Sequence, residues 1–343
     1  MSVADASTVP AAGIQPVVRS GSTLLGDVAM MTRPRIALMV LATVATGMWL
    51  TAGGGIGGWT LAGVLAGTAL VAASSSVANQ ILERDTDRLM PRTAGRPLPA
   101  GRVEPAVAAI LSGVLLMVGG GVLAASGGWP AAVTALATWL LYVAVYTPLK
   151  RRTPLNTAIG AIAGAMPVVI GAVAAGSPAR LAAGDAAGTL AAAAFATLLY
   201  LWQFPHFMAI AWLYRRQYAD AGLRMLTVDD PSGLRAAGQS LAAALAMLPV
   251  GLVLAVPSGS VRLFFAEAAA VGLYVAATAH FAVRRDDLSA RRLLLASLGT
   301  LLAVMAAAVA LGRPAVAADS RRATVAVTID TVSPDTLADF GNR

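Results

Sequence analysis

The polar segment after the second apolar stretch carries an amide and two carboxylates at regular spacing. Asn79, Glu83 and Asp87 stand at i, i+4 and i+8, so a helix that continues through them places all three on one face, within roughly 80° of one another. Mg²⁺ accepts one or two carboxylates, keeps several waters and completes its shell with phosphate oxygens of a substrate. This face therefore suits Mg²⁺. The alternative is a solvated loop in which the acids pair with Arg84 and Arg88.

Basic residues follow directly. Arg92 and Arg96 lie four residues apart, and the guanidinium fork is shaped to bind phosphate oxygens in a bidentate way. Carboxylates that hold a metal beside arginines that hold an anion form a diphosphate-binding combination. A second polar segment, Lys150-Arg151-Arg152, follows another apolar stretch, and by itself it is also typical of a stop-transfer signal.

A third group of polar side chains lies inside an apolar stretch. Gln203 and His206 flank Pro205 in the run Trp202 to Phe207. Polar groups within a membrane are costly and usually face a bundle interior or a cavity. We expect a broken helix with a buried imidazole, which either contacts a cofactor such as haem iron or makes a structural hydrogen bond.

The composition indicates what must position these residues. Of the 343 residues, 57% are hydrophobic and only 12% are charged, and the mean hydropathy is +0.73. Soluble chains carry about 25% charged residues, so a water-soluble fold is excluded. The absence of cysteine excludes disulfides and thiolate metal sites. The net charge of +8 is explained by membrane topology rather than by nucleic acid.

The apolar stretches predict an all-α integral membrane protein. A transmembrane helix needs about 20 mostly apolar residues, and charges used as boundaries divide the chain into nine such spans. The expected spans are 36–52, 60–82, 105–126, 129–147, 155–175, 188–214, 236–256, 262–283 and 292–311.

The distribution of basic residues predicts the orientation. An alternating path that starts in the cytoplasm places 19 of the 25 Lys and Arg residues on the cytoplasmic side, as the positive-inside rule requires. We therefore expect a cytoplasmic N-terminus and an external C-terminus in the cell (plasma) membrane, with the three polar segments toward the cytoplasm. Residues 1–33 form a flexible N-terminal tail in this interpretation, 34–312 the membrane domain and 313–343 a polar C-terminal tail.

These segments together resemble the UbiA superfamily of membrane prenyltransferases, and most closely its haem O synthase branch. The resemblance covers roughly residues 30 to 311 in order and spacing. Four motifs carry it: N-x3-[DE]-x3-D at Asn79, Glu83 and Asp87; M-x-R-T-x-x-R-P-[LI] at Met90, Arg92, Thr93, Arg96, Pro97 and Leu98; Y-x3-K with the run K-R-x-T-P-x-N at Tyr146, Lys150, Arg151, Thr153, Pro154 and Asn156; and W-Q-F-P-H-F at Trp202 to Phe207.

The resemblance implies a UbiA-type bundle that transfers the farnesyl group of farnesyl diphosphate to a vinyl group of haem B. It implies Mg²⁺ as cofactor, the lipid bilayer as surroundings and a haem A synthase as a partner that receives the product. The roles implied for single residues are metal binding by Asn79, Glu83, Asp87 and Asp220; diphosphate binding by Arg92, Arg96, Lys150 and Arg151; catalysis by Asn79, Glu83, Asp87, Tyr146 and Lys150; and haem binding by Trp202, Gln203 and His206.

The sequence departs from the family pattern at one place. After W-Q-F-P-H-F the family usually continues R-[DE]-D-Y, whereas this chain has Arg216 and Gln217 in place of the two acids. In the superfamily this region holds a second Mg²⁺. Three outcomes stay open: Asp220 serves instead, the second metal binds more weakly, or activity is reduced.

Two other functions fit part of the pattern. Another UbiA-type prenyltransferase, acting on an aromatic acid or a quinone precursor, would share the diphosphate site, but the segment with His206 argues against it. A multi-span transporter also places polar residues at interrupted helices. It would show two similar halves, and the sequence has no such internal repeat.

Overall fold

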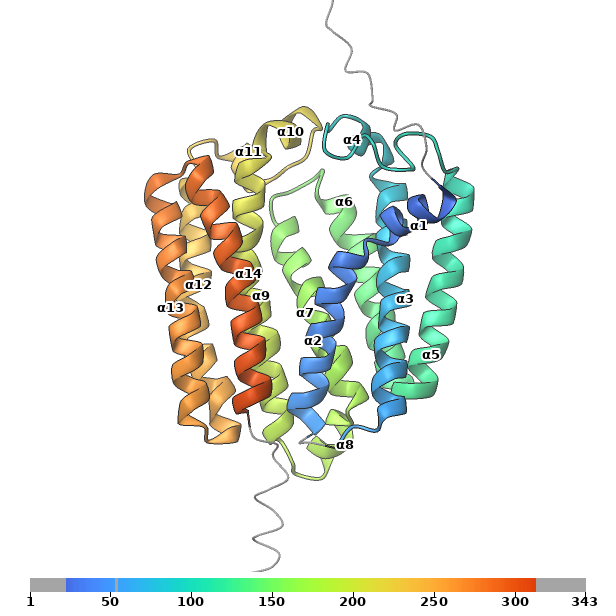
Figure 1. The fold of residues 1–343 in the computed structure, drawn as a ribbon. Coiled ribbons are helices and arrows are strands. Elements are labelled where there is room, and N and C mark those ends of the chain that lie inside the picture. The colour runs from blue at the N-terminus through green and yellow to red at the C-terminus, as the bar shows by residue number, and fades with distance from the viewer. Residues whose placement is uncertain (1–22, 53–54, 313–343) are drawn as a thin grey trace, which may run out of the picture.

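The computed structural model describes residues 23–52 and 55–312, and every regular element in this part of the chain is helical. Figure 1 shows the helices as one upright bundle. The elements are α1 Leu24–Thr32, α2 Pro34–Ala52, α3 Gly58–Leu82, α4 Arg84–Arg88, α5 Pro105–Leu140, η1 Leu141–Tyr146 (a π-helix), α6 Thr147–Leu149, α7 Asn156–Ala174, α8 Ser177–Ala182, α9 Ala187–Leu213, α10 Arg215–Asp220, α11 Leu226–Asp229, α12 Leu234–Ala255, η2 Val256–Ser258 (a 3₁₀ turn), α13 Val261–Arg284 and α14 Asp287–Leu311.

Eight helices in the described residues are long and apolar enough to cross a membrane, where the sequence predicts nine spans. Seven of the predicted spans each match one helix to within a few residues. The remaining two, 105–126 and 129–147, fall together in the continuous element Pro105–Leu149. The difference between eight and nine therefore lies entirely in how residues 105–149 are divided.

Gly128 interrupts α5 between the two expected spans. Its dihedral angles, φ 80° and ψ 166°, are not helical, and only glycine adopts such a positive φ without strain. The Ser74 hydroxyl of α3 donates a hydrogen bond to the carbonyl of Ser112, which precedes Gly128 in α5. The same hydroxyl accepts a hydrogen bond from the indole N–H of Trp139, which follows Gly128. In a straight helix Ser112 and Trp139 would lie about 40 Å apart, so α5 doubles back at Gly128.

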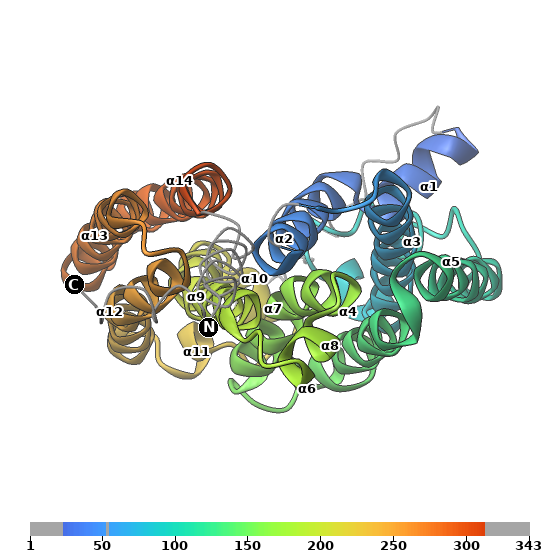
Figure 2. The same ribbon diagram turned by 90° about the horizontal axis from the view of Figure 1, so that it is seen from below.

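The long helices form two groups (Figure 2). One group consists of α2, α3, α5 and α7, and the other consists of α12, α13 and α14. Helix α9 lies between them and packs against members of both groups. The short helices α4, α6, α10 and α11 gather at one end of the bundle, and α8 lies at the other (Figure 1). The three polar segments therefore meet at one end, because the helices that precede them all run in that direction.

Glycines allow α2 and α7 to touch backbone to backbone. A Cβ at Gly47 would overlap the Val168 carbonyl oxygen, and a Cβ at Gly171 would overlap the Val44 carbonyl oxygen. Small residues at helix contacts are the usual means of close approach in lipid, where no hydrophobic driving force brings helices together. The α2–α7 contact is therefore fixed by Gly47 and Gly171.

The expectation of a broken helix at Pro205 is wrong. α9 continues through this residue. A proline removes one backbone N–H, and neighbouring helices in a membrane protein can bond the carbonyl groups near it. Next to the proline, the Tyr274 hydroxyl on α13 donates to the Trp202 carbonyl at 2.9 Å, which ties α9 to α13 at this level.

The two predicted tails are only partly described. Within 1–33, residues Leu24–Thr32 form α1, whose N-cap Thr23 accepts a hydrogen bond from the Gly26 N–H at 3.2 Å. Residues 1–22 and 313–343 lie outside the described residues.

A single methyl group added at the α2–α7 contact tests this packing. We expect Gly171→Ala to lower the melting temperature measured by tryptophan fluorescence in detergent, because overpacking a tight contact costs about 1–3 kcal/mol. Gly113→Ala is the matched control, since a Cβ there meets no atom within 4 Å. Equal melting temperatures of the two variants would contradict the proposed close contact.

Candidate functional site

Asn79 lies one turn before the end of α3 and is only 1% exposed. Its Nδ2 donates to the Thr147 hydroxyl of α6 at 3.0 Å. Its Oδ1 is buried and has no hydrogen-bond partner among the described residues. Buried polar atoms in native proteins almost always have a partner, so this amide oxygen is available to a ligand that binds oxygen.

Glu83 forms an ion pair across the segment between α3 and α4. Its Oε1 accepts a hydrogen bond from Lys150 Nζ at 2.7 Å, and both side chains are 14% exposed. Lys150 also lies over the ring of Tyr146, 4.6 Å from its centre. Burial alone would lower the pKa of Lys150, but Tyr146 and Glu83 outweigh it and hold the pKa above its ordinary value. Lys150 is therefore a fixed positive charge.

Asp87 on α4 forms the second ion pair. Its Oδ2 accepts a hydrogen bond from Arg96 Nη1 at 2.6 Å, and Asp87 is only 1% exposed. Burial raises the pKa of Asp87, and Arg96 opposes this effect. Burial lowers the pKa of Arg96, and the nearby charge of Arg33 lowers it further. A guanidinium still stays protonated in proteins, so the pair is ionic and Arg33 lies close to it.

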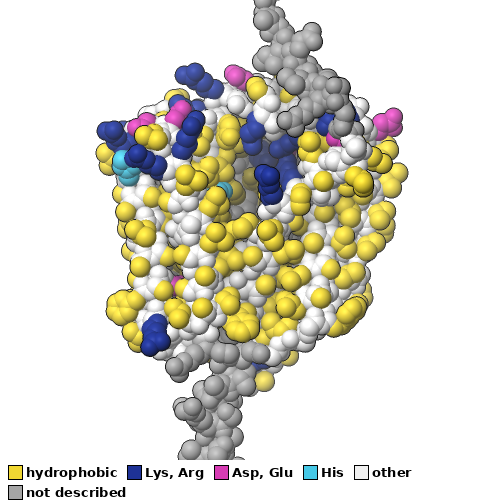
Figure 3. Space-filling view, in the orientation of Figure 1, with side chains coloured by type: hydrophobic (Ala, Val, Ile, Leu, Met, Phe, Trp, Pro, Cys, Tyr) yellow, Lys and Arg dark blue, Asp and Glu magenta, His cyan; other side chains and the backbone are white. Residues whose placement is uncertain are grey.

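A cavity of about 320 Å³ lies among α2, α3, α5, η1, α7 and α9. Tyr146 and Arg33 line it, and these residues adjoin the two ion pairs. Most of the remaining lining is apolar, with Val40, Val71 and Ile170 as examples. Figure 3 shows a hollow near the upper end of this face, with Lys and Arg side chains gathered in it. The site therefore joins an ionic end to an apolar chamber.

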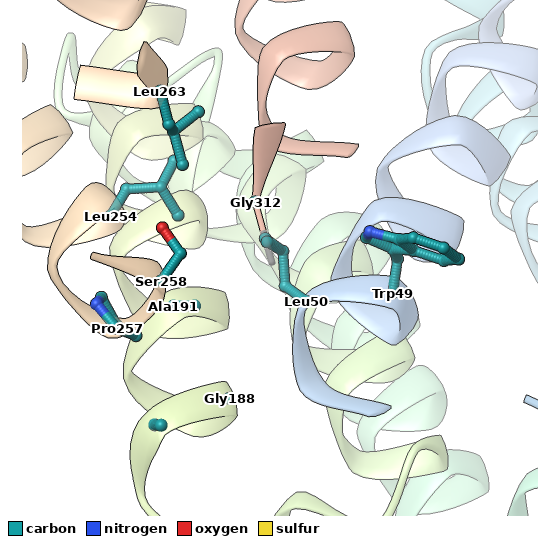
Figure 4. Close-up of a pocket in the computed structure, with 10 residues that line it drawn as sticks. Trp49, Leu50, Gly188, Ala191, Leu254, Pro257, Ser258, Leu263 and Gly312 are labelled. Carbon is teal, nitrogen blue, oxygen red and sulfur yellow. The ribbon is translucent and has the colours of Figure 1, made fainter. Parts of the chain in front are cut away.

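Another pocket lies near the opposite end of the bundle, where Leu50, Leu254 and Leu263 converge (Figure 4). Its volume is about 20 Å³, which is enough for one water molecule only. Its lining holds no charged side chain. The 320 Å³ cavity is therefore the better candidate for a substrate.

The residues at the ionic end fit a hard cation. Asn79 contributes an unpaired amide oxygen, and Glu83 and Asp87 contribute two carboxylates, each of which uses one oxygen for its ion pair. The described residues contain no cluster of three or more His, Cys, Asp or Glu side chains that could hold a metal. Such a sparse oxygen set matches Mg²⁺, which takes its remaining ligands from water and phosphate.

The comparison with known families decides the assignment. Residues 40–302 match the UbiA prenyltransferase family. This chain belongs to that family. The match and the eight apolar helices identify a multi-span membrane protein.

Curated relatives narrow the position within the UbiA family. The chain is 41% identical over 283 residues to a protoheme IX farnesyltransferase of Rhodopirellula baltica, covering 80% of this chain and 96% of the relative. It is 37% identical over 268 residues to a protoheme IX farnesyltransferase of Koribacter versatilis, covering 77% of this chain and 83% of the relative.

Solved UbiA-family structures share the fold. A digeranylgeranylglyceryl phosphate synthase aligns with a TM-score of 0.69 at 15% identity, covering 84% of this chain and 98% of that chain. A UbiA homolog from Archaeoglobus fulgidus bound to GPP and Mg²⁺ aligns with a TM-score of 0.57 at 17% identity, covering 82% of this chain and 99% of that chain.

None of the four expected diphosphate residues, Arg92, Arg96, Lys150 and Arg151, lines the 320 Å³ cavity. Arg92 is exposed, and its guanidinium lies 4.6 Å from the centre of the Tyr214 ring. Arg151 lines a second cavity of about 270 Å³ together with Arg152 and Glu83. Arg92 and Arg151 therefore surround the ionic end without lining the apolar chamber.

The region that departs from the UbiA pattern forms α10. Asp220, the expected substitute metal ligand, is exposed at the end of this helix, and Arg216 is exposed as well. The Gln217 Oε1 is buried and has no partner among the described residues. A neutral oxygen is therefore available close to the position where the family carries an acid.

The expected haem residues lie on α9 but face different neighbours. Gln203 lines the 320 Å³ cavity, and its Nε2 donates to the Ala161 carbonyl at 2.9 Å. Trp202 stacks on His206 and donates to the Ser297 carbonyl. His206 Nδ1 lies 2.8 Å from the Ser297 hydroxyl. One imidazole nitrogen is therefore occupied by α14, and only Gln203 of the three lines the cavity.

Arg33 lies at the candidate site although the sequence predicts no binding role for it. From the sequence it contributes only to the basic residues that set the orientation in the membrane. It links α1 to α2 in a left-handed conformation, with φ 50° and ψ 61°. This conformation is rare for a residue other than glycine, and residues so strained cluster at functional sites. The signal that could have found it is a basic residue directly before Pro34 at the start of the first span.

The buried pair of Asp87 and Arg96 predicts a stability effect. Arg96→Met leaves the Asp87 carboxylate buried without its partner, which costs about 3–5 kcal/mol, whereas replacing both partners by apolar groups costs much less. We therefore expect Arg96→Met to melt at a clearly lower temperature than the double variant Arg96→Met/Asp87→Leu. A double variant that melts no higher than the single one would contradict a buried ionic pair.

Proposed function

We propose that this chain transfers the farnesyl group of farnesyl diphosphate to a vinyl group of haem B (protohaem IX), which gives haem O and diphosphate. One observation carries the proposal: two carboxylates, an unpaired amide oxygen and their partner cations lie beside Tyr146 and Arg33, which line a largely apolar cavity. The names of the curated relatives supply the acceptor and the prenyl donor.

The ionic end binds the leaving group in this proposal. Asn79, Glu83 and Asp87 would hold Mg²⁺, which supplies neutralisation of the diphosphate charge. Lys150 and Arg96 lie in contact with these carboxylates and stabilise the negative charge that develops as the carbon–oxygen bond breaks. Arg33, Arg92 and Arg151 add positive charge around them. For a second cation the chain offers Asp220 and the buried oxygen of Gln217.

The apolar cavity receives the farnesyl tail. Tyr146 lies between Lys150 and the cavity, so its ring faces the carbon that becomes cationic, and an aromatic face attracts a cation. Exclusion of water protects the farnesyl cation until the haem vinyl group attacks. Diphosphate has left when this cation forms. Attack by the vinyl group makes the carbon–carbon bond and moves the positive charge to the other vinyl carbon, where water adds and loses a proton to give the hydroxyl group.

We further propose that Trp202, Gln203 and His206 form the haem side of the site. Gln203 lines the cavity, and Trp202 and His206 of the same helix stack on each other. The Nδ1 of His206 is held by Ser297, which orients the ring and leaves Nε2 for a ligand.

The basic residues support a location in the plasma membrane with the ionic end toward the cytoplasm. That end carries most of the Lys and Arg residues of the chain, as the positive-inside rule predicts. A haem A synthase that consumes the product is a partner in this proposal.

The first test is to incubate membranes containing the protein with haem B, farnesyl diphosphate and Mg²⁺, and to examine the extracted haems by mass spectrometry. We expect haem O, and no haem O after EDTA. We expect Glu83→Gln to lower turnover at least a hundredfold while its amount in the membrane stays unchanged, since one ligand oxygen is weakened but no span is altered. Metal-independent turnover, or normal turnover of Glu83→Gln, would refute the metal assignment.

The haem side has a separate test. We expect His206→Ala to weaken haem binding, measured by the Soret absorbance during titration, while the KM for farnesyl diphosphate stays within about twofold. Ser297→Ala should have a smaller effect, because it removes only the hydroxyl that orients the ring. Unchanged haem affinity in His206→Ala would remove this residue from the haem side.

A further inference from the structure

The depth of the 320 Å³ cavity can be measured along the helices that line it. On α7 the lining runs from Gly160 to Ile170, and along α5 and η1 it runs from Tyr146 to Ala135. At 1.5 Å of rise per residue these distances are about 15 Å and about 16 Å. The two elements along which the lining runs furthest therefore give nearly the same depth.

The far end of the cavity is closed by packed side chains. Ile170, Val71 and Ala135 belong to a buried apolar cluster that continues below the cavity with Met48 and Val64. Ile170 is only 2% exposed. Beside it, Gly47 and Gly171 hold the α2 and α7 backbones in direct contact. Interiors packed in this way do not open without cost, so this floor is rigid.

The opposite end of the cavity is open. Ile36, which lines the cavity near its upper end, is 57% exposed. Arg33 lies one turn above it on the path to the ion pairs. A prenyl diphosphate can therefore enter at the ionic end and extend toward the floor, where Thr68 and Ile170 stop it.

We propose that this floor limits the donor to three isoprene units, and that Thr68, Ala135 and Ile170 set the limit. An extended isoprene unit spans four bonds and about 5 Å at ordinary carbon–carbon bond lengths. Three units need about 15 Å, which equals the depth, and a fourth unit would run into the buried cluster. The inference rests on the proposed function, because it concerns the tail of the same substrate.

Two substitutions shift the limit in opposite directions. Ile170→Ala removes three carbons from the floor. Ala72→Leu fills the cavity on α3 one turn above Thr68, about 6 Å higher and thus about one isoprene unit. We expect Ile170→Ala to raise the ratio of kcat/KM for geranylgeranyl over farnesyl diphosphate at least tenfold, and Ala72→Leu to raise the ratio for geranyl over farnesyl diphosphate by a similar factor.

The experiment measures haem products by mass spectrometry with the three diphosphates. In parallel, the rise in melting temperature that each diphosphate causes reports its binding without turnover. Ile162→Ala is the matched control, since it makes the same truncation on α7 at a residue that is 41% exposed and does not line the cavity. The control should keep the wild-type ratios.

The outcomes separate this inference from the proposed function. One outcome is that no haem is prenylated, while the melting temperatures still rank the three diphosphates as expected and the ranking shifts in Ile170→Ala and Ala72→Leu. This outcome supports the limit on chain length and refutes haem as the acceptor. If the wild type uses geranylgeranyl diphosphate as well as farnesyl diphosphate, the floor does not limit the chain. An equal change in Ile170→Ala and Ile162→Ala of the kcat/KM ratio for geranylgeranyl over farnesyl diphosphate would also overturn the proposal.

Discussion

A charge buried within an apolar bundle is stable only when it is paired, and this constraint organises the polar end of the protein. Asp87 is almost fully buried and Glu83 is mostly buried, and each is bonded to a cation from another segment: Glu83 to Lys150 and Asp87 to Arg96. The first pair ties the end of α3 to α6, and the second ties α4 to the loop that follows it. Since removal of either partner leaves a buried charge, the contacts that keep the end folded also keep its cations beside its carboxylates.

Below the ionic end, glycines decide where the interior is filled and where it is hollow. A Cβ at Gly160 would lie 2.6 Å from the Tyr146 ring, and a Cβ at Gly164 would overlap the Gln203 amide. These two glycines make room for cavity-lining side chains that come from η1 and α9. Gly171, further along the same helix, instead closes the space against α2. One helix, α7, thus shapes both the chamber and its floor.

The sequence predicts the parts of this structure that depend on local spacing. Most span limits follow from charges next to apolar runs. The expectation of one helix through Asn79, Glu83 and Asp87 is wrong, because α3 ends at Leu82 and Glu83 joins it to the separate helix α4. What depends on distant packing is not predictable in this way. The role of Arg33 requires a left-handed turn into α2, the hydrogen bond from Tyr274 of α13 to α9 joins residues 72 positions apart, and the depth of the cavity depends on which helices touch below it.

The division into an ionic end and an apolar chamber also restricts where an acceptor can approach in the proposed reaction. The diphosphate is held by groups around Glu83 and Asp87, and the tail occupies the chamber, so the bond that breaks lies at the boundary marked by Tyr146 and Arg33. Gln203 is the residue of the expected haem side that lines this chamber. The helix α9 packs against both α2 and α14. In the proposed reaction, an acceptor held by α9 meets the donor carbon from the side that Gln203 lines, and the closed floor plays no part in its entry.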